Sequence, residues 1–187
     1  MWGWALTEEK IGSNASQLQT NVKENQQGYL LNGNKKWIGN GNRDYLIVYA
    51  KNQTNNKING NIKHNLGFIV DQKHKGIKVE KIEKKLALRM VDNCKITFNN
   101  VQLPSDSFIP DAKSYRKGVE SMLKLSRLQV IFITAGVCMG IYRNTIKYVT
   151  ERKQFGTPIA SFQLIQLKVT EIMSNLQAIM LMCQRAA

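Results

Sequence analysis

The chain has 187 residues, of which 43% are hydrophobic and 21% charged, a composition typical of a globular protein with one domain or one and a half small ones. Its net charge of +14 is spread over both halves, with 16 basic against 10 acidic side chains in residues 1–112 and 11 against 3 in residues 113–187. Because no helix-turn-helix, zinc-finger or RNP motif gathers these charges, the sequence predicts no nucleic-acid partner and favours a small ligand with several phosphates.

The cysteines and the apolar runs further restrict the class of protein that the sequence can encode. Cys94, Cys138 and Cys183 are odd in number and share no CxxC spacing, which is typical of reduced thiols in an intracellular protein and predicts neither a disulfide nor a metal site. The richest apolar stretch, residues 128–142, carries polar residues and is shorter than the roughly 18 residues that a membrane span needs. We therefore expect no signal peptide and no membrane partner.

Short β-patterned segments separated by turn residues fill about the first hundred residues and predict a barrel or sandwich. Asn32-Gly33 predicts a type I′ hairpin turn, because these residues adopt positive φ at little cost. Trp37 lies on the predicted return arm, where a core tryptophan would be usual. Gly39 and Asn40 after it are small or polar, which indicates that something approaches the backbone closely. The predicted strands are 4–7, 18–22, 29–31, 36–38, 45–50, 66–70, 77–79 and 95–98.

Polar segments separate these strands from a helical region. Residues 52–65 are rich in asparagine and predict a surface loop. His64 and His74 lie in or beside such loops with no partner at ligand spacing, so neither predicts a metal site. Pro104 and Pro110 flank a polar linker, after which the apolar period changes from two to nearly four. The pattern therefore predicts a β-domain over residues 1–110 and a helical domain over residues 111–187.

Residues 118–151 predict one long helix that is apolar nearly all round, as in the interior of a bundle. The sequence at 154–156 ends it, and Pro158 suits the first turn of a second helix. Apolar spacings of three and four in that helix predict core packing in preference to a lipid or cofactor face. The predicted fold class is α+β: an antiparallel barrel or sandwich followed by two long helices of an incomplete four-helix bundle. The stripe of the second helix comprises Phe162, Ile165, Val169, Ile172, Met173, Leu176, Met180 and Cys183.

Two segments carry a family resemblance. WALTEEKIGS at residues 4–13 and NGNKKWIGN at residues 32–40 resemble the A-L-T-E-P-x-x-G-S-D and N-G-x-K-x-W-I-T-N patterns in the middle β-domain of acyl-CoA dehydrogenases and acyl-CoA oxidases. Residues 81–104 resemble the segment that closes that domain. The resemblance implies that both motifs line the isoalloxazine ring of FAD, although Gly39 stands where many members have a threonine that bonds flavin N5. The implied flavin neighbours are Trp4, Leu6, Thr7, Gly12, Ser13, Trp37, Ile38 and Gly39.

ERKQFG at residues 151–156, followed by Phe162-Gln163, resembles the R-x-Q-F-G and F-Q motifs of the C-terminal helical domain of the family. There the arginine reaches the FAD pyrophosphate held by the neighbouring subunit, a role that suits the planar guanidinium. An arginine at a helix end is otherwise usually a solvated cation. The chain looks most similar to the short-chain acyl-CoA oxidase and glutaryl-CoA dehydrogenase branch. The implied cofactor-binding residues are Arg152, Gln154, Phe155 and Gln163, and the implied substrate-binding residues are Ser13 and Arg127.

The resemblance assigns no catalytic residue, because the family's glutamate base has no counterpart in this sequence. Ser126 precedes Arg127 where some branches carry the base, and Glu120 lies about two helical turns away. The resemblance implies an FAD-dependent acyl-CoA dehydrogenase or oxidase that forms a trans-2-enoyl-CoA from a short-chain acyl-CoA in fatty acid or amino acid degradation. We expect a fragment that is inactive alone; the alternative is a non-catalytic remnant acting as a structural or assembly subunit. Expected partners are acyl-CoA and either further copies or a complementing subunit, in the mitochondrial matrix or the peroxisome.

Overall fold

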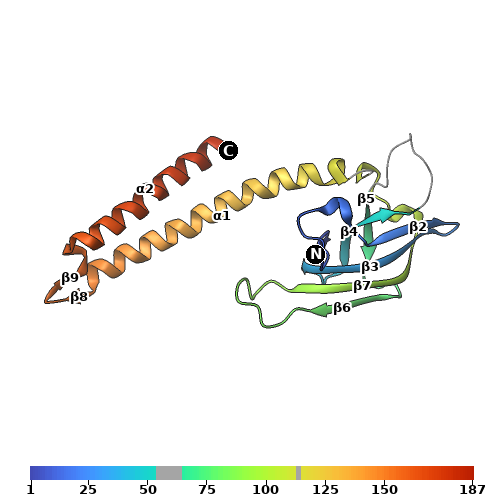
Figure 1. Cartoon of the computed structure of the whole chain (residues 1–187), viewed down its shortest axis with the longest axis horizontal. Helices are drawn as coiled ribbons and strands as arrows, with labels where there is room; N and C mark the ends of the chain where they lie inside the picture. Colours follow the sequence, from blue (N-terminus) through green and yellow to red (C-terminus); the bar gives the residue numbers. More distant parts are fainter. Residues whose placement is uncertain (54–64, 113–114) are drawn as a thin grey trace. The chain divides into compact units, whose positions relative to one another are not determined.

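The computed structural model describes residues 1–53, 65–112 and 115–187. These residues form two compact units, Met1–Ser121 and Met122–Ala187 (Figure 1). The predicted loop at residues 52–65 falls almost wholly outside the described residues, and so does His64.

The first unit is built on a curled sheet of seven strands (Figure 1). The strand order is β1-β4-β2-β3-β7-β6, and β5 pairs with β4. Most neighbours are antiparallel, as predicted, but β1 and β2 both run parallel to β4. The predicted α+β class, with the β-domain first, is confirmed. The strands are β1 (Trp2–Ala5), β2 (Asn21–Asn25), β3 (Gly28–Gly39), β4 (Tyr45–Asn52), β5 (Asn65–Asp71), β6 (Ile77–Lys81) and β7 (Asn93–Leu103).

Alternating burial along the strands builds the core of this unit. In β7, Cys94, Ile96 and Phe98 are buried, whereas the residues between them are only half-buried. Burying each large apolar side chain stabilises the fold by about 1.5–3 kcal/mol. The period of two read from the sequence therefore identifies the inner face of the sheet. The core cluster comprises Ala5, Val22, Leu31, Ile38, Leu46, Val48, Ala50, Phe68, Val70, Cys94, Ile96, Phe98, Val101 and Leu103.

Strand β3 runs unbroken through residues 32–33, so the hairpin turn predicted there is wrong. Gly33 has φ 141°, and a Cβ on it would lie 2.5 Å from Thr20 Cα. The pairing of β3 with β7 changes register at the same point. The Asn-Gly pair therefore marks a close backbone approach at a bulge, which needs glycine for the same reason as a turn does. The turn that enters β3 lies at Asn25–Gly28, where Gly28 has φ 121°.

The second unit contains most of one helix and the whole of another, and these lie side by side (Figure 1). Helix α1 (Tyr115–Glu151) and helix α2 (Gln163–Ala186) confirm the two long helices predicted from the sequence. Between them, β8 (Lys153–Gln154) pairs with β9 (Thr157–Pro158) around Phe155 and Gly156, which have φ 52° and 79°. Pro158 lies in β9 and not in the first turn of α2, because a 3₁₀ turn at Ile159–Ser161 precedes that helix.

Both helices leave apolar side chains uncovered among the described residues. In the predicted stripe of α2, Leu176 and Cys183 are buried, whereas Met173 and Met180 are 48% and 41% exposed. Within α1, residues Leu123–Glu151 are long and apolar enough to cross a membrane, a property that the shorter stretch at 128–142 did not predict. Little of this stretch is buried. The exposed stripe on α1 comprises Val130, Ile133, Val137, Ile141 and Tyr148, spaced three, four or seven residues apart.

Candidate functional site

The chain leaves β1 as a segment, residues 6–13, that is tied to the edge of β3. The carbonyl oxygen of Leu6 accepts a hydrogen bond of 2.9 Å from Lys35 Nζ. The carbonyl oxygen of Thr7 accepts one of 3.0 Å from the backbone N–H of Lys36. Both contacts join residues nearly thirty positions apart, so the two motifs read from the sequence meet in the structure.

The same segment then folds into a tight turn. Glu8 and Ile11 exchange backbone hydrogen bonds of 3.0 and 3.3 Å. Gly12 and Ser13 follow the turn and are exposed, and a Cβ on Gly12 would meet nothing within 4 Å. The turn therefore presents the end of the motif to solvent, while its beginning is fixed against the sheet.

A buried ion pair lies beneath this segment. Lys35 Nζ donates to Glu8 Oε1 at 3.0 Å, and the two side chains are 0% and 6% exposed. The Glu8 carboxylate also accepts the backbone N–H groups of Gln19 and Thr20 at 2.8 and 2.9 Å. Burying a charge is costly unless it is paired and hydrogen-bonded, and both conditions are met here.

The pKa values of the pair reflect this balance. Burial alone would raise the pKa of Glu8, but the Lys35 charge and the N–H groups of Gln19 and Thr20 together hold it below its ordinary value. Burial lowers the pKa of Lys35 to about 8, against the opposing effect of the Glu8 charge. Charged Glu8 is therefore favoured by its surroundings in the fold.

Trp37 is turned outward by a bulge in β3. The register of β3 against β7 shifts between Lys35 and Ile38, so both of these side chains are buried although they are three residues apart. Trp37 between them has φ 64° and is 52% exposed. A bulky residue in this region costs about 1–3 kcal/mol, and such strain is concentrated at functional sites. The carbonyl of Trp37 accepts a hydrogen bond of 3.3 Å from Asn93 Nδ2.

The other residues predicted to lie beside the ligand differ in how much of the side chain or backbone is free to contact it. Trp4 is half-buried and packs on the buried Tyr49 with ring centroids 5.0 Å apart. The Ile38 side chain belongs to the core, so only its backbone could contact a ligand. A Cβ on Gly39 would make only ordinary contacts, 3.6 Å to Val91 Cγ1 and 3.9 Å to Asn93 Nδ2. Position 39 therefore has room for a side chain.

Thr7 provides the unused hydrogen-bonding capacity of the site. Its carbonyl is bonded to Lys36, but within the described part of the chain its backbone N–H and its hydroxyl donate to no group. Polar groups that are half-buried without a partner mark places where a ligand would complete the hydrogen bonds. The Thr7 carbonyl is bonded to Lys36, whose Nζ lies 5.9 Å from the centroid of the half-exposed Trp37 ring. Free donors at Thr7 suit a ligand that carries acceptor atoms along one edge.

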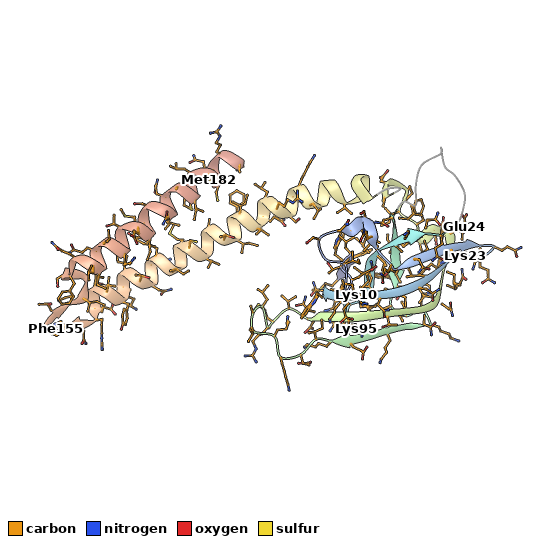
Figure 2. All side chains as sticks on the ribbon, in the orientation of Figure 1. Lys10, Lys23, Glu24, Lys95, Phe155 and Met182 are labelled. Carbon is orange, nitrogen blue, oxygen red and sulfur yellow. The ribbon has the colours of Figure 1, made fainter. Side chains whose placement is uncertain are left out.

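A second group of predicted residues lies at the helix–hairpin–helix junction of the other unit. Arg152 closes α1 through its backbone, which donates to Tyr148 at 2.8 Å and accepts from Ile159 at 2.8 Å. Its side chain is exposed and makes no ion pair with any residue that the structure describes. Figure 2 shows Phe155 at the tip of the hairpin. It is 94% exposed and meets Phe162 edge to face, with ring centroids 6.1 Å apart. Gln154 and Gln163 are exposed on either side of this turn.

Arg127 lies on α1, away from this junction, and is exposed. It belongs to the helical unit and Ser13 to the β unit, so the predicted substrate pair is divided between the two. In the described residues no group of three or more His, Cys, Asp or Glu side chains could hold a metal ion.

No role for Lys35 or for Glu8 is predicted from the sequence. A signal was present, because β3 places Lys35 on the inner face of the sheet, where a lysine needs a buried partner. The partner could not be read from the pattern, since Glu8 lies 27 residues earlier on another segment.

Comparisons with known proteins give the class of this fold. Residues 3–101 match the family described as acyl-CoA dehydrogenase, middle domain, and residues 117–187 match acyl-CoA dehydrogenase, C-terminal domain. A mitochondrial isovaleryl-CoA dehydrogenase of Arabidopsis thaliana is 30% identical over 93% of this chain and 42% of its own length. A mitochondrial 2-methylacyl-CoA dehydrogenase of Solanum tuberosum is 32% identical over the same shares.

A solved structure agrees with this result. A glutaryl-CoA dehydrogenase of Mycobacterium smegmatis in complex with FADH2 superposes with a TM-score of 0.89 at 28% identity, over 98% of this chain and 45% of that one. The chain therefore belongs to the acyl-CoA dehydrogenase family and spans less than half of the length of these relatives.

Proposed function

We propose that this chain carries the flavin-facing half of an acyl-CoA dehydrogenase that converts a short-chain acyl-CoA to a trans-2-enoyl-CoA. The observation that carries the proposal is the backbone bond from Lys36 to the Thr7 carbonyl, which ties the free donors of Thr7 to the strand residue before the strained, exposed Trp37. The family binds FAD, and the M. smegmatis relative was solved with its reduced form. FAD, when bound, accepts the β-hydrogen of the substrate as a hydride and so supplies the redox chemistry.

The chain's own residues would bind and orient the FAD and the acyl-CoA. The Thr7 N–H and hydroxyl would bond the acceptor edge of the pyrimidine ring, and the Trp37 ring would cover one flank and exclude water. Arg152 would place its guanidinium against the pyrophosphate of an FAD held by another copy of the chain, which supports a homo-oligomer. Ser13 and Arg127 would lie beside the acyl-CoA.

Removal of the α-proton needs a carboxylate within hydrogen-bond reach, and the family resemblance assigns that role to no carboxylate of this sequence. Several of the described carboxylates are also held by lysines. Glu8 is buried under Lys35, Glu9 pairs with Lys36, and Glu171 pairs with Lys168 at 3.2 Å. We therefore expect no dehydrogenation by the chain alone, and activity only with a complementing piece that carries the base. The mitochondrial names of several relatives favour the mitochondrial matrix over the peroxisome.

A structural or assembly subunit is the second candidate. It is favoured by the exposed apolar stripe of α1, which would pack against further helices of a bundle, a use that also accounts for the membrane-like length and composition of that helix. Such a subunit would contact its partners through α1 and would have no need of Thr7 or Trp37.

An NMR titration of the labelled chain with FAD separates the two candidates, because it detects weak binding. We expect shifts at the Thr7 and Gly39 amides and at the Trp37 indole, and a loss of affinity of about tenfold or more in Trp37→Ala, on the scale of one buried aromatic contact. Trp2→Ala is the matched control, since Trp2 is 50% exposed but stacks on Tyr45. Shifts confined to the helices, or equal effects of the two substitutions, would contradict the flavin assignment.

A further inference from the structure

We propose that the buried Lys35–Glu8 pair is a positioning device that sets the Leu6–Thr7 peptide at the height and angle needed to bind the flavin edge. This inference rests on the proposed function. It adds a role for two residues that contact no ligand themselves.

The geometry gives Lys35 two attachments, and both are on the same short segment. Its Nζ donates to the Leu6 carbonyl at 2.9 Å and to Glu8 Oε1 at 3.0 Å. It therefore holds the residue before Thr7 and the residue after Thr7 from a single point on β3. The Thr7 carbonyl is held in turn by the backbone of Lys36 at 3.0 Å. With both flanks and its carbonyl fixed, Thr7 retains its N–H and hydroxyl for a ligand.

Glu8 extends the same device to a third segment. Its carboxylate accepts the N–H groups of Gln19 and Thr20, just before β2. Thr20 is itself fixed, because its hydroxyl donates to the Asn34 carbonyl at 3.2 Å and Gly33 lies close against it. The pair therefore connects the binding segment to both β2 and β3 in the interior of the unit.

A neighbouring ion pair shows that a lysine and a glutamate of these two segments can pair at the surface without being buried. Lys36 and Glu9 pair at the surface, where their side chains are 27% and 58% exposed, one residue along from each member of the buried pair. A surface pair of this kind contributes about 0–1 kcal/mol. A pair buried at 0% and 6% is costly to desolvate, and an apolar replacement of the same shape is often as stable. Stability therefore does not explain why charges lie here, whereas holding a carbonyl and a carboxylate from one amine does.

We expect substitutions of the pair to affect the stability of the fold and the affinity for FAD differently. Lys35→Met leaves a buried unpaired carboxylate, so it should lower both the melting temperature and the flavin affinity. The double variant Lys35→Met/Glu8→Gln removes both charges, so the melting temperature should largely recover. The attachment of the Leu6 carbonyl is still lost in the double variant, so the affinity for FAD should stay about tenfold or more below that of the parent chain. Affinities are measured at low temperature, where each variant is folded.

Amide hydrogen exchange of the full chain without ligand is the second measurement. In the double variant we expect faster exchange, by about tenfold or more, at the Glu8 and Ile11 amides that close the turn, with unchanged protection at Val48 and Ile96 in the core. The control is Lys78→Met/Glu80→Gln, which removes an exposed pair 3.2 Å apart on β6 and should change neither exchange at the turn nor affinity.

The two measurements distinguish a failure of the proposed function from a failure of the positioning role. If the parent chain binds no FAD, the proposed function fails, and the exchange rates at Glu8 and Ile11 still decide whether the pair holds the segment. If the parent binds FAD and the double variant binds it equally well, or if its exchange rises uniformly through the core, the positioning role is overturned. Recovery of melting temperature without recovery of affinity supports it.

Discussion

The two units of this chain bury their apolar residues to very different degrees. In the β unit the core cluster is enclosed by its own strands, and its members are at most 2% exposed. In the helical unit, Ile133, Val137 and Ile141 on α1 are all more than half exposed. Folding is driven by apolar burial, so the β unit contains the partners of its core, whereas the helical unit presents a surface suited to further helices. On the β unit, the backbone of Leu6 and Thr7, which we propose to lie beside flavin, is fixed by contacts with Lys35 and Lys36.

Truncation of a core residue should show the contrast most strongly. Phe68 in β5 is fully buried and contacts Tyr29 edge to face, with centroids 5.0 Å apart. Phe68→Ala should lower the free energy of unfolding by about 3–5 kcal/mol. Ile133→Ala, at a position 65% exposed on α1, should cost less than about 1 kcal/mol in the same urea titration. Similar losses at the two positions would show that α1 is already covered in solution.

One glycine in each unit allows the same comparison of tight and open packing. Gly33→Ala would force a Cβ to within 2.5 Å of Thr20 Cα at φ 141°, and should destabilise the β unit by at least about 2 kcal/mol. Gly136→Ala places a Cβ where nothing lies within 4 Å, inside a helix, and should stabilise α1 by up to about 1 kcal/mol. Thermal unfolding of both variants checks the opposite signs. A loss of stability in Gly136→Ala would indicate a helix packed against that glycine.

The pH dependence of stability tests the interior of the β unit. The pKa of Glu8 is lower in the fold than its ordinary value of 4.5, so its contribution is present above that pH and is lost as the pH falls through the folded pKa. The stability gap between the parent chain and Glu8→Gln should therefore narrow below about pH 4.5, by at most about 1.4 kcal/mol per pH unit. Urea unfolding from pH 7 to pH 3 measures this gap. A gap that stays constant with pH would contradict the assignment. Glu80→Gln, at an exposed site, should differ from the parent chain in stability by almost nothing at any of these pH values.

The smallest expected effect concerns position 39, where this chain has glycine and many members of the family have threonine. Because a Cβ on Gly39 would make only ordinary contacts, Gly39→Thr should fold normally and add a hydroxyl beside the flavin ring. One added hydrogen bond contributes about 0.5–1.5 kcal/mol, so FAD affinity should rise by roughly two- to tenfold. Gly39→Val is the matched control, with similar shape and no hydroxyl. Equal affinities for the two variants would place position 39 away from the ring.

The sequence predicts some parts of this structure well because their signals are local. The period of two in β7 follows directly from backbone geometry and identifies buried residues. The spacing of three and four in α2 identifies the face that carries the buried Leu176 and Cys183, but Met173 and Met180 on that face are partly exposed. The motif at residues 4–13 and the motif around Trp37 also meet in space, as the family resemblance implied. These features need no knowledge of distant contacts.

Other parts depend on contacts that a local pattern does not contain. Asn32-Gly33 shows that positive φ is needed, but a turn and a bulge share that need, and only the position of Thr20 distinguishes them. The outward rotation of Trp37 results from one extra residue in β3 relative to β7. The burial of Lys35 depends on Glu8 in another segment. The roles of Arg152 and the other predicted ligand residues stay predictions.

We propose that this chain holds the flavin face of a dehydrogenase and that none of its own carboxylates acts as the base, and one experiment tests this most directly. The chain is mixed anaerobically with FAD and a short-chain acyl-CoA, and the visible absorbance of the flavin is followed together with enoyl-CoA formation. We expect no bleaching and no enoyl-CoA from the chain alone, although FAD shifts the Thr7 and Trp37 signals, and bleaching once a piece carrying a glutamate base is added. Bleaching by the chain alone that is abolished in Glu120→Gln would contradict the account and place the base on α1.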